Sequence, residues 1–133
     1  MKYMLDTNIC IYAIKNKPGD ILSKLKEHLE DGICISTITL AELQFGVEKS
    51  QYRERNQFAL LKFLSFIEVL PFDTYAAVEY GKINFDLKQK GQLIGNMDML
   101  IAAHAKSRDI TVVTNNEREF KRVENLKLEN WVS

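Results

Sequence analysis

The sequence predicts an α/β protein, a three-layer α/β/α sandwich built on a central, mostly parallel sheet. Short apolar runs of strand length alternate along the chain with longer segments whose apolar residues recur at helical spacing. Strands separated by helices are joined by right-handed crossovers, which give a parallel sheet covered on both faces. With two prolines, six glycines and no repeat or low-complexity linker, residues 1–133 are expected to form a single domain.

The predicted strands are the apolar runs 2–5, 33–36, 68–72, 111–114 and 126–132. Pro71 indicates that the third is an edge strand, because proline cannot donate to a neighbouring strand. The predicted helices cover residues 8–15, 20–30, 39–49, 53–66, 74–90 and 96–108. Their expected boundary residues are Pro18-Gly19 and Gly32 as stops, Asp73 or Thr74 as the cap of the fifth helix, and Asn96 as the cap of the last.

Composition and charge narrow the class of protein. No apolar run reaches the roughly 18 residues that span a membrane, and Asp6 interrupts the first apolar run before a signal-peptide core forms, so a cytoplasmic protein is expected. Cys10 and Cys34 have no metal-site or disulfide spacing and are expected to be buried thiols. The net charge of zero disfavours a protein that coats nucleic acid, but a nuclease remains open because a bound metal ion brings its own positive charge.

Acidic residues follow the predicted strands. Asp6 ends the first strand, Glu42 and Asp98 lie in the first turns of two later helices, and Glu119 lies shortly after the strand over 111–114. Because the carboxyl ends of parallel strands meet at one edge of a sheet, these acids are expected to converge. Two carboxylates about 4 Å apart repel by roughly 4 kcal/mol at an effective dielectric of about 20. A divalent cation that prefers oxygen, Mg²⁺ or Mn²⁺, is therefore expected among them.

The acids are expected to have different roles. Asp6 and Asp98 are short side chains with little freedom and are the expected metal ligands, whereas the longer Glu42 is expected to orient or deprotonate the attacking water. Each of two acids also fits a structural role: Glu42 completes a capping box with Thr39, and Asp98 is favoured near a helix N-terminus. Asp6 has no evident structural task.

Four polar residues next to the acids are expected either to orient carboxylates or to cap local turns: Thr7, Asn8, Ser36 and Thr37. His104 lies among alanines in a helix and is expected to be a packed or hydrogen-bonded core residue. The aromatic side chains of Phe58, Phe63 and Phe66 are expected in the core or in a dimer contact rather than under stacked bases.

Four segments, in order along the chain, resemble the PIN-domain toxins of the VapC type. They are Met4-Leu5-Asp6-Thr7-Asn8, the stretch 36–43, the stretch 94–105, and Val113-Thr114-Asn115-Asn116 with Arg118-Glu119-Phe120. The resemblance extends to about Trp131 and implies a PIN-like fold. It implies a Mg²⁺- or Mn²⁺-dependent endoribonuclease toxin that hydrolyses phosphodiester bonds in structured RNA, often tRNA, with a metal-activated water. It also implies a homodimer, inhibition by a VapB-like antitoxin, and a larger hetero-oligomer with it.

Carried over by position, Asp6, Glu42 and Asp98 match the acidic triad of that family. Many members have an aspartate where this chain has Asn116, and Glu119 is the acid expected to contribute in its place. Asn116 is expected to bond to Asp6 or to a water on the metal. The loss of one carboxylate favours one tightly bound cation over two.

Two basic clusters are candidates for contacts with the RNA backbone: Arg118, Lys121 and Arg122, or Lys49, Arg53 and Arg55. A catalytically weak PIN-like module, acting by RNA binding or protein assembly, is the alternative function. An acid-cluster phosphatase is disfavoured because no second acid lies two residues after Asp6. A dinucleotide-binding protein is disfavoured because no glycine-rich loop follows the first strand.

Overall fold

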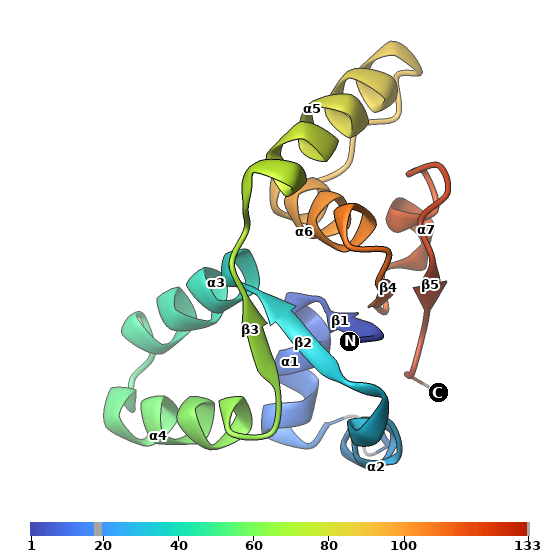
Figure 1. Cartoon of the computed structure of the whole chain (residues 1–133). Helices are drawn as coiled ribbons and strands as arrows, with labels where there is room; N and C mark the ends of the chain where they lie inside the picture. The colour runs from blue at the N-terminus through green and yellow to red at the C-terminus, as the bar shows by residue number, and fades with distance from the viewer. Residues whose placement is uncertain (18–19, 133) are drawn as a thin grey trace.

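The computed structural model describes residues 1–17 and 20–132, in which a five-stranded sheet forms the centre (Figure 1). The strands are β1 (Tyr3–Leu5), β2 (Ile33–Ser36), β3 (Glu68–Leu70), β4 (Thr111–Val113) and β5 (Leu128–Glu129). Their spatial order is β3-β2-β1-β4-β5, and each neighbouring pair is parallel. The predicted α/β sheet is confirmed, and β3, which ends just before Pro71, lies at an edge as expected.

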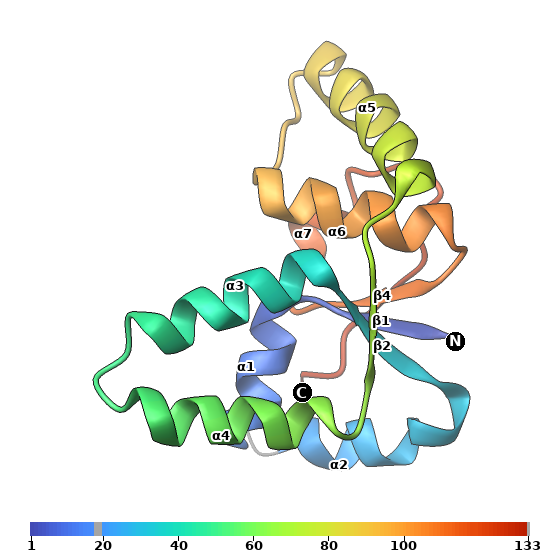
Figure 2. The same ribbon diagram turned by 60° about the vertical axis from the view of Figure 1, so that its left-hand side comes forward.

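Helices cover both faces of the sheet (Figure 2). They are α1 (Thr7–Lys15), α2 (Ile21–Glu27), the short 3₁₀ helix η1 (Leu29–Asp31), α3 (Thr37–Glu48), α4 (Arg53–Leu64), α5 (Thr74–Gln89), α6 (Asn96–Ser107) and α7 (Glu117–Phe120). In β1, Tyr3 and Leu5 pack with α1 to α4, whereas Met4 packs with α5 and α6. Because successive side chains of a strand point to opposite faces, this division shows the predicted three layers.

Several helix boundaries differ from the predictions. The start predicted at Thr39 is wrong, because Ser36 has an extended backbone and its Oγ accepts the N–H of Ile38 at 3.1 Å, so α3 begins two residues earlier. The expected Asn96 cap is also wrong, since Gly95 holds the cap position and Asn96 lies inside α6. The predicted helix over 20–30 is divided into α2 and η1.

Other boundary predictions are confirmed or fall outside the description. Asp73 caps α5, where its Oδ1 accepts the N–H of Ala76 at 3.0 Å. Pro18-Gly19 lie outside the described residues, and α1 ends at Lys15 before Asn16, whose φ is 55°. Both cysteines are buried free thiols, as predicted. Within residues 1–17 and 20–132, no helix is long and apolar enough to cross a membrane.

Candidate active site

The four predicted acids lie at one edge of the sheet, where its strands end. Asp6 follows β1 directly, Glu42 lies in α3 after β2, Asp98 lies in the first turn of α6, and Glu119 lies in α7 after β4. Asp98 interacts electrostatically with each of the other three carboxylates. The convergence expected from the parallel topology is therefore present in the structure.

Asp6 is the most restrained of these acids. Its side chain is 3% exposed, its Oδ1 accepts the N–H of Ile9 at 3.0 Å, and its Oδ2 accepts the hydroxyl of Thr114 at 2.5 Å. Burial raises the pKa of Asp6, the two hydrogen bonds oppose the rise, and Glu42 adds to it. The expectation that Asp6 lacks a structural task is wrong, because it is also the N-cap of α1.

Thr114 is a site residue that the sequence reasoning missed. Its hydroxyl donates to Asp6 and accepts the backbone N–H of Asn116 at 2.8 Å, and its side chain is fully buried. A hydroxyl directly after an apolar strand, at the same edge as Asp6, was the available signal.

Glu42 lies deeper in its helix than predicted. Because α3 begins at Thr37, Glu42 is its sixth residue, and the capping box with Thr39 is absent from this part of the described chain. Its Oε1 instead accepts the hydroxyl of Thr7 at 2.5 Å. Thr7 immediately follows Asp6, so this hydrogen bond brings Glu42 to the end of β1.

Asp98 is held more loosely, beside a neutral amide. The side-chain amide of Asn116 donates to Asp98 Oδ2 at 3.4 Å and to Glu119 Oε2 at 2.9 Å. The expected bond from Asn116 to Asp6 is replaced by an indirect link through Thr114. Burial, followed by the charges of Asp6, Glu119 and Glu42, raises the pKa of Asp98 from 3.8 to about 6, against the hydrogen bond from Asn116.

In the part of the chain that the structure describes, no basic side chain pairs with these acids. Among the ion pairs of the described residues, none includes Asp6, Glu42, Asp98 or Glu119. Across the same ranges, no three His, Cys, Asp or Glu side chains form a ready-made metal cage. Mg²⁺ usually takes only one or two protein carboxylates and completes its shell with water. An all-oxygen set with uncompensated charge therefore fits a hard divalent cation, without requiring a cage of three or more protein ligands.

A family model described as the PIN domain matches residues 3–126 of the chain. The chain belongs to the PIN-domain family. It is 50% identical over 132 residues to "Ribonuclease VapC2" of Rickettsia felis, covering 98% of both chains, and 48% identical to "tRNA(fMet)-specific endonuclease VapC" of Shigella flexneri, again covering 98% of both. It also matches a solved structure of VapBC2 from Rickettsia felis bound to a promoter DNA fragment. The TM-score is 0.94 and the identity 49%, over 99% of this chain and all of that one. The resemblance to VapC-type PIN domains is confirmed.

Some predicted residues of this PIN domain lie apart from the acids. Asn8 is exposed in α1, and within the described ranges its side chain has no hydrogen bond to an acid. Ser36 Oγ bonds to Ile38 and to His104 rather than to a carboxylate. In the basic cluster near the last motif, Arg122 donates to the carbonyl of Leu93 at 3.0 Å, whereas Arg118 and Lys121 are exposed.

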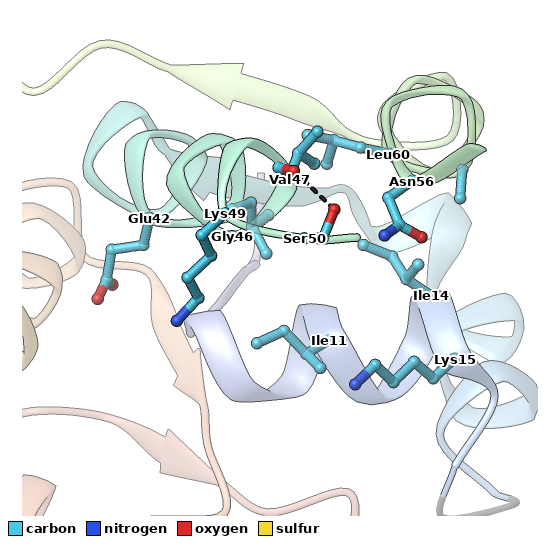
Figure 3. A pocket seen from close by; sticks show the side chains of 12 residues that line it. Ile11, Ile14, Lys15, Glu42, Gly46, Val47, Lys49, Ser50, Asn56 and Leu60 are labelled. Carbon is cyan, nitrogen blue, oxygen red and sulfur yellow. Dashed lines mark hydrogen bonds between the residues drawn. The ribbon is translucent and has the colours of Figure 1, made fainter. Parts of the chain in front are cut away.

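A mainly apolar groove of this PIN domain adjoins the acids. It lies between α1, α3 and α4, with Glu42 at one end and Asn56 and Leu60 towards the other (Figure 3). Lys15 and Lys49 lie along its rim. Of the three phenylalanines predicted to lie in the core or in a dimer contact, Phe63 is in the core at 7% exposed. Phe58 and Phe66 are 70% and 56% exposed on the surface.

Proposed function

We propose that this chain is a single-domain VapC-type endoribonuclease toxin that acts in the cytoplasm and hydrolyses phosphodiester bonds in structured RNA, with tRNA as the substrate class. The observation that carries the proposal is the convergence of four carboxylates, without a basic partner among the described residues, at the edge where α/β folds place their sites. The names of its relatives as ribonuclease and tRNA(fMet)-specific endonuclease support the same chemistry.

A divalent cation, Mg²⁺ or Mn²⁺, is proposed between Asp6 and Asp98. When bound, it supplies positive charge for the phosphoryl oxygens and lowers the pKa of water. Asp6 fixes one ligand position because its backbone and hydroxyl donors leave it little freedom. Asp98, whose pKa is about 6, is the ligand whose ionisation the cation favours. Asn116 contributes a neutral amide where a further acid would raise the charge, which favours one cation over two.

Glu42 is proposed to orient the attacking water and take its proton. One oxygen, Oε1, is occupied by the hydroxyl of Thr7. The other oxygen has no hydrogen-bond partner in the described part of the chain, and can therefore face the water. Glu119 is placed by Asn116, and we assign it the task of keeping that amide oriented towards Asp98. Arg118 and Lys121, which are exposed beside the last motif, are proposed to contact backbone phosphates.

The activity is tested with purified, antitoxin-free protein incubated with total RNA and Mg²⁺. Discrete cleavage products are expected, and they should disappear with EDTA and in Asp6→Ala. Lys127→Ala is the surface control and should cleave like the wild type, because Lys127 precedes β5, at the edge of the sheet away from the acids, and its ion pair is with the exposed Asp109. RNA binding without cleavage by the wild type would instead establish the alternative, a catalytically weak RNA-binding module.

Two exposed surfaces are proposed for protein partners. The groove beside Glu42 is assigned to a VapB-like antitoxin, because an inhibitor must cover the acids and this is the apolar surface that adjoins them. Solved structures similar to this chain are VapBC complexes. A homodimer contact is assigned to α5, where Tyr75, Val78 and Phe85 are 77%, 55% and 65% exposed at helical spacing. Both contacts together would give the larger hetero-oligomer.

Two glycines offer matched tests of these surfaces, since a Cβ added at Gly46 or at Gly81 meets nothing within 4 Å beyond its own stretch of helix. Gly46 lines the groove and Gly81 shares the face of Val78 and Phe85. We expect Gly46→Tyr to weaken antitoxin binding at least tenfold while the toxin remains dimeric, and Gly81→Tyr to give monomers. Calorimetry and light scattering measure the two effects. The reverse pattern would exchange the two assignments.

A further inference from the structure

The mechanism leaves one buried polar pair without a function. His104 Nδ1 lies 2.7 Å from Ser36 Oγ, and both side chains are fully buried. The two residues are 68 positions apart and belong to different elements: Ser36 ends β2 and caps α3, while His104 lies in α6. Burial of such groups is costly unless they are hydrogen-bonded, so this pair is a specific feature of the interior.

The protonation of the pair follows from counting donors and acceptors. Ser36 Oγ already accepts the N–H of Ile38, so its hydroxyl proton has His104 Nδ1 as its acceptor. This arrangement gives a neutral imidazole with the proton on Nε2, which has no partner among the described residues. The opposite tautomer would leave two atoms unsatisfied there, the serine proton and the Nε2 lone pair. Burial also lowers the pKa of His104, and Phe72 packs edge-on against the ring at 5.5 Å.

The pair joins the two helices that carry Glu42 and Asp98. Glu42 lies six residues after Ser36 and Asp98 six residues before His104, which is roughly 9 Å of helix rise in each case. Helices are stiff over this length, so the position of each helix determines where its carboxylate lies. Apolar contacts alone are non-directional, whereas a buried hydrogen bond fixes one relative position of α3 and α6.

Ser36 ends β2, which pairs with β1, the strand that Asp6 follows. We propose that the Ser36–His104 hydrogen bond sets where Asp98 lies relative to Asp6 and Glu42, and that His104 is thus a positioning residue for the cation site. The inference rests on the proposed function, because it concerns the same carboxylates. His104 acts through Ser36, and among the described residues its ring nitrogens have no hydrogen bond to an acid of the site.

Two amide variants separate positioning from simple packing. Asn places an acceptor near the position of Nδ1, whereas Gln places its amide near Nε2 and leaves Ser36 without its partner. We expect His104→Gln to weaken Mn²⁺ binding to the purified protein about fivefold, within the range for packed hydrogen-bonded networks. His104→Asn should bind Mn²⁺ like the wild type although its smaller side chain makes it the less stable variant. The affinity is measured from the electron paramagnetic resonance signal of unbound Mn²⁺.

Ile101→Val is the packing control, because Ile101 is fully buried in α6 and outside the hydrogen bond. It should lower the melting temperature without changing Mn²⁺ affinity. Equal Mn²⁺ binding by His104→Gln and the wild type, or an equal loss in Ile101→Val, would overturn the proposal.

Nitrogen chemical shifts of His104 in the metal-free protein give a second test. A neutral ring protonated on Nε2 is expected, and a ring protonated on Nδ1 would contradict the assigned hydrogen bond. If the wild type binds no Mn²⁺, the proposed function fails, while this measurement still decides whether the hydrogen bond exists. If His104→Gln does not fold, the test rests on the Mn²⁺ affinity of His104→Asn and on the chemical shifts. A weakened affinity in His104→Asn or a ring protonated on Nδ1 would contradict the proposal.

Discussion

The two sides of the acidic site are built differently. On one side Asp6 is 3% exposed and accepts hydrogen bonds at 3.0 and 2.5 Å from donors in α1 and at the end of β4. On the other side Asp98 is partly exposed and accepts one bond of 3.4 Å from Asn116. The buried side combines a structural cap with the site, so the fold determines its position. The open side is restrained by a longer hydrogen bond, and partial burial together with the neighbouring carboxylates raises the pKa of Asp98 to about 6.

Asp6→Asn is expected to have the largest effect on activity. The amide keeps an oxygen for the N–H of Ile9, so α1 remains capped and the melting temperature should fall by at most a few degrees. Loss of the charge on the fixed side should reduce RNA cleavage about 1000-fold. Single-turnover kinetics measure the loss of cleavage, and thermal unfolding measures the change in melting temperature. A cleavage loss below tenfold would remove Asp6 from the proposed ligands.

Asp98→Asn should reduce cleavage about 100-fold and make the metal-free protein more stable near pH 7. The pKa of Asp98 is higher in the folded state, so the protonated form favours folding. Ionisation of Asp98 therefore lowers the free energy of unfolding of the wild type as pH rises from about 4 to about 6. Above about pH 6 this destabilisation is fully present. After allowance for solvent screening of this partly exposed group, the gain in the variant is about 1 kcal/mol.

Urea unfolding of metal-free protein at several pH values tests this prediction. The difference in stability between Asp98→Asn and the wild type should vanish near pH 4. If the difference in stability does not change with pH, its cause is packing rather than the ionisation of Asp98.

Thr114→Val removes the hydroxyl that donates to Asp6 while keeping the shape of the side chain, and the N–H of Ile9 remains as the other donor. A buried carboxylate then loses its hydroxyl partner and the N–H of Asn116 loses its acceptor, so we expect a loss of about 1 to 3 kcal/mol in stability. Cleavage should fall about tenfold, as for other residues that orient a ligand. Thr114→Ser, which keeps the hydroxyl, should recover most of the activity; failure to do so would contradict the orienting role.

Asn116→Asp tests the open side and should have the smallest effect on cleavage, within a few-fold. An added carboxylate beside Asp98 and Glu119 should destabilise the metal-free protein by about 1 kcal/mol and raise the number of bound Mn²⁺ ions from one to two. The melting temperature of the metal-free protein checks the destabilisation, and a Mn²⁺ titration checks the number of bound ions. An unchanged stoichiometry would show that Asn116 does not limit the cation count.

The sequence was most informative where one signal dominated. The short apolar runs that alternate with helical segments, together with the crossover rule, predict the parallel sheet, and the strand ends then bring Asp6, Glu42 and Asp98 to one edge. The start of α3 was harder to locate because Ser36 and Thr39 are both good caps. Only the backbone of Ser36, extended at the end of β2, decides between them.

Contacts between distant residues were not predictable in the same way. The bonds from Asn116 to Asp98 and from Ser36 to His104 depend on how α6 packs against its neighbours, and no local pattern encodes that packing. Thr114 differs from these, because its position directly after β4 was a usable signal, although its bond to Asp6 also depends on the pairing of β4 with β1.

The order of the site residues along the chain has a consequence for synthesis. β1 pairs with β2 on one side and with β4 on the other, and the hydroxyl that holds Asp6 comes 108 residues after it. At roughly 5 to 20 residues per second, a ribosome needs about 5 to 20 s to make that stretch. Throughout that interval the nascent chain has the first acid but not the strand that fixes it. Asp98 and Glu119 also come late in the chain. The site proposed for RNA cleavage is therefore complete only near the end of synthesis, when β4 can pair with β1.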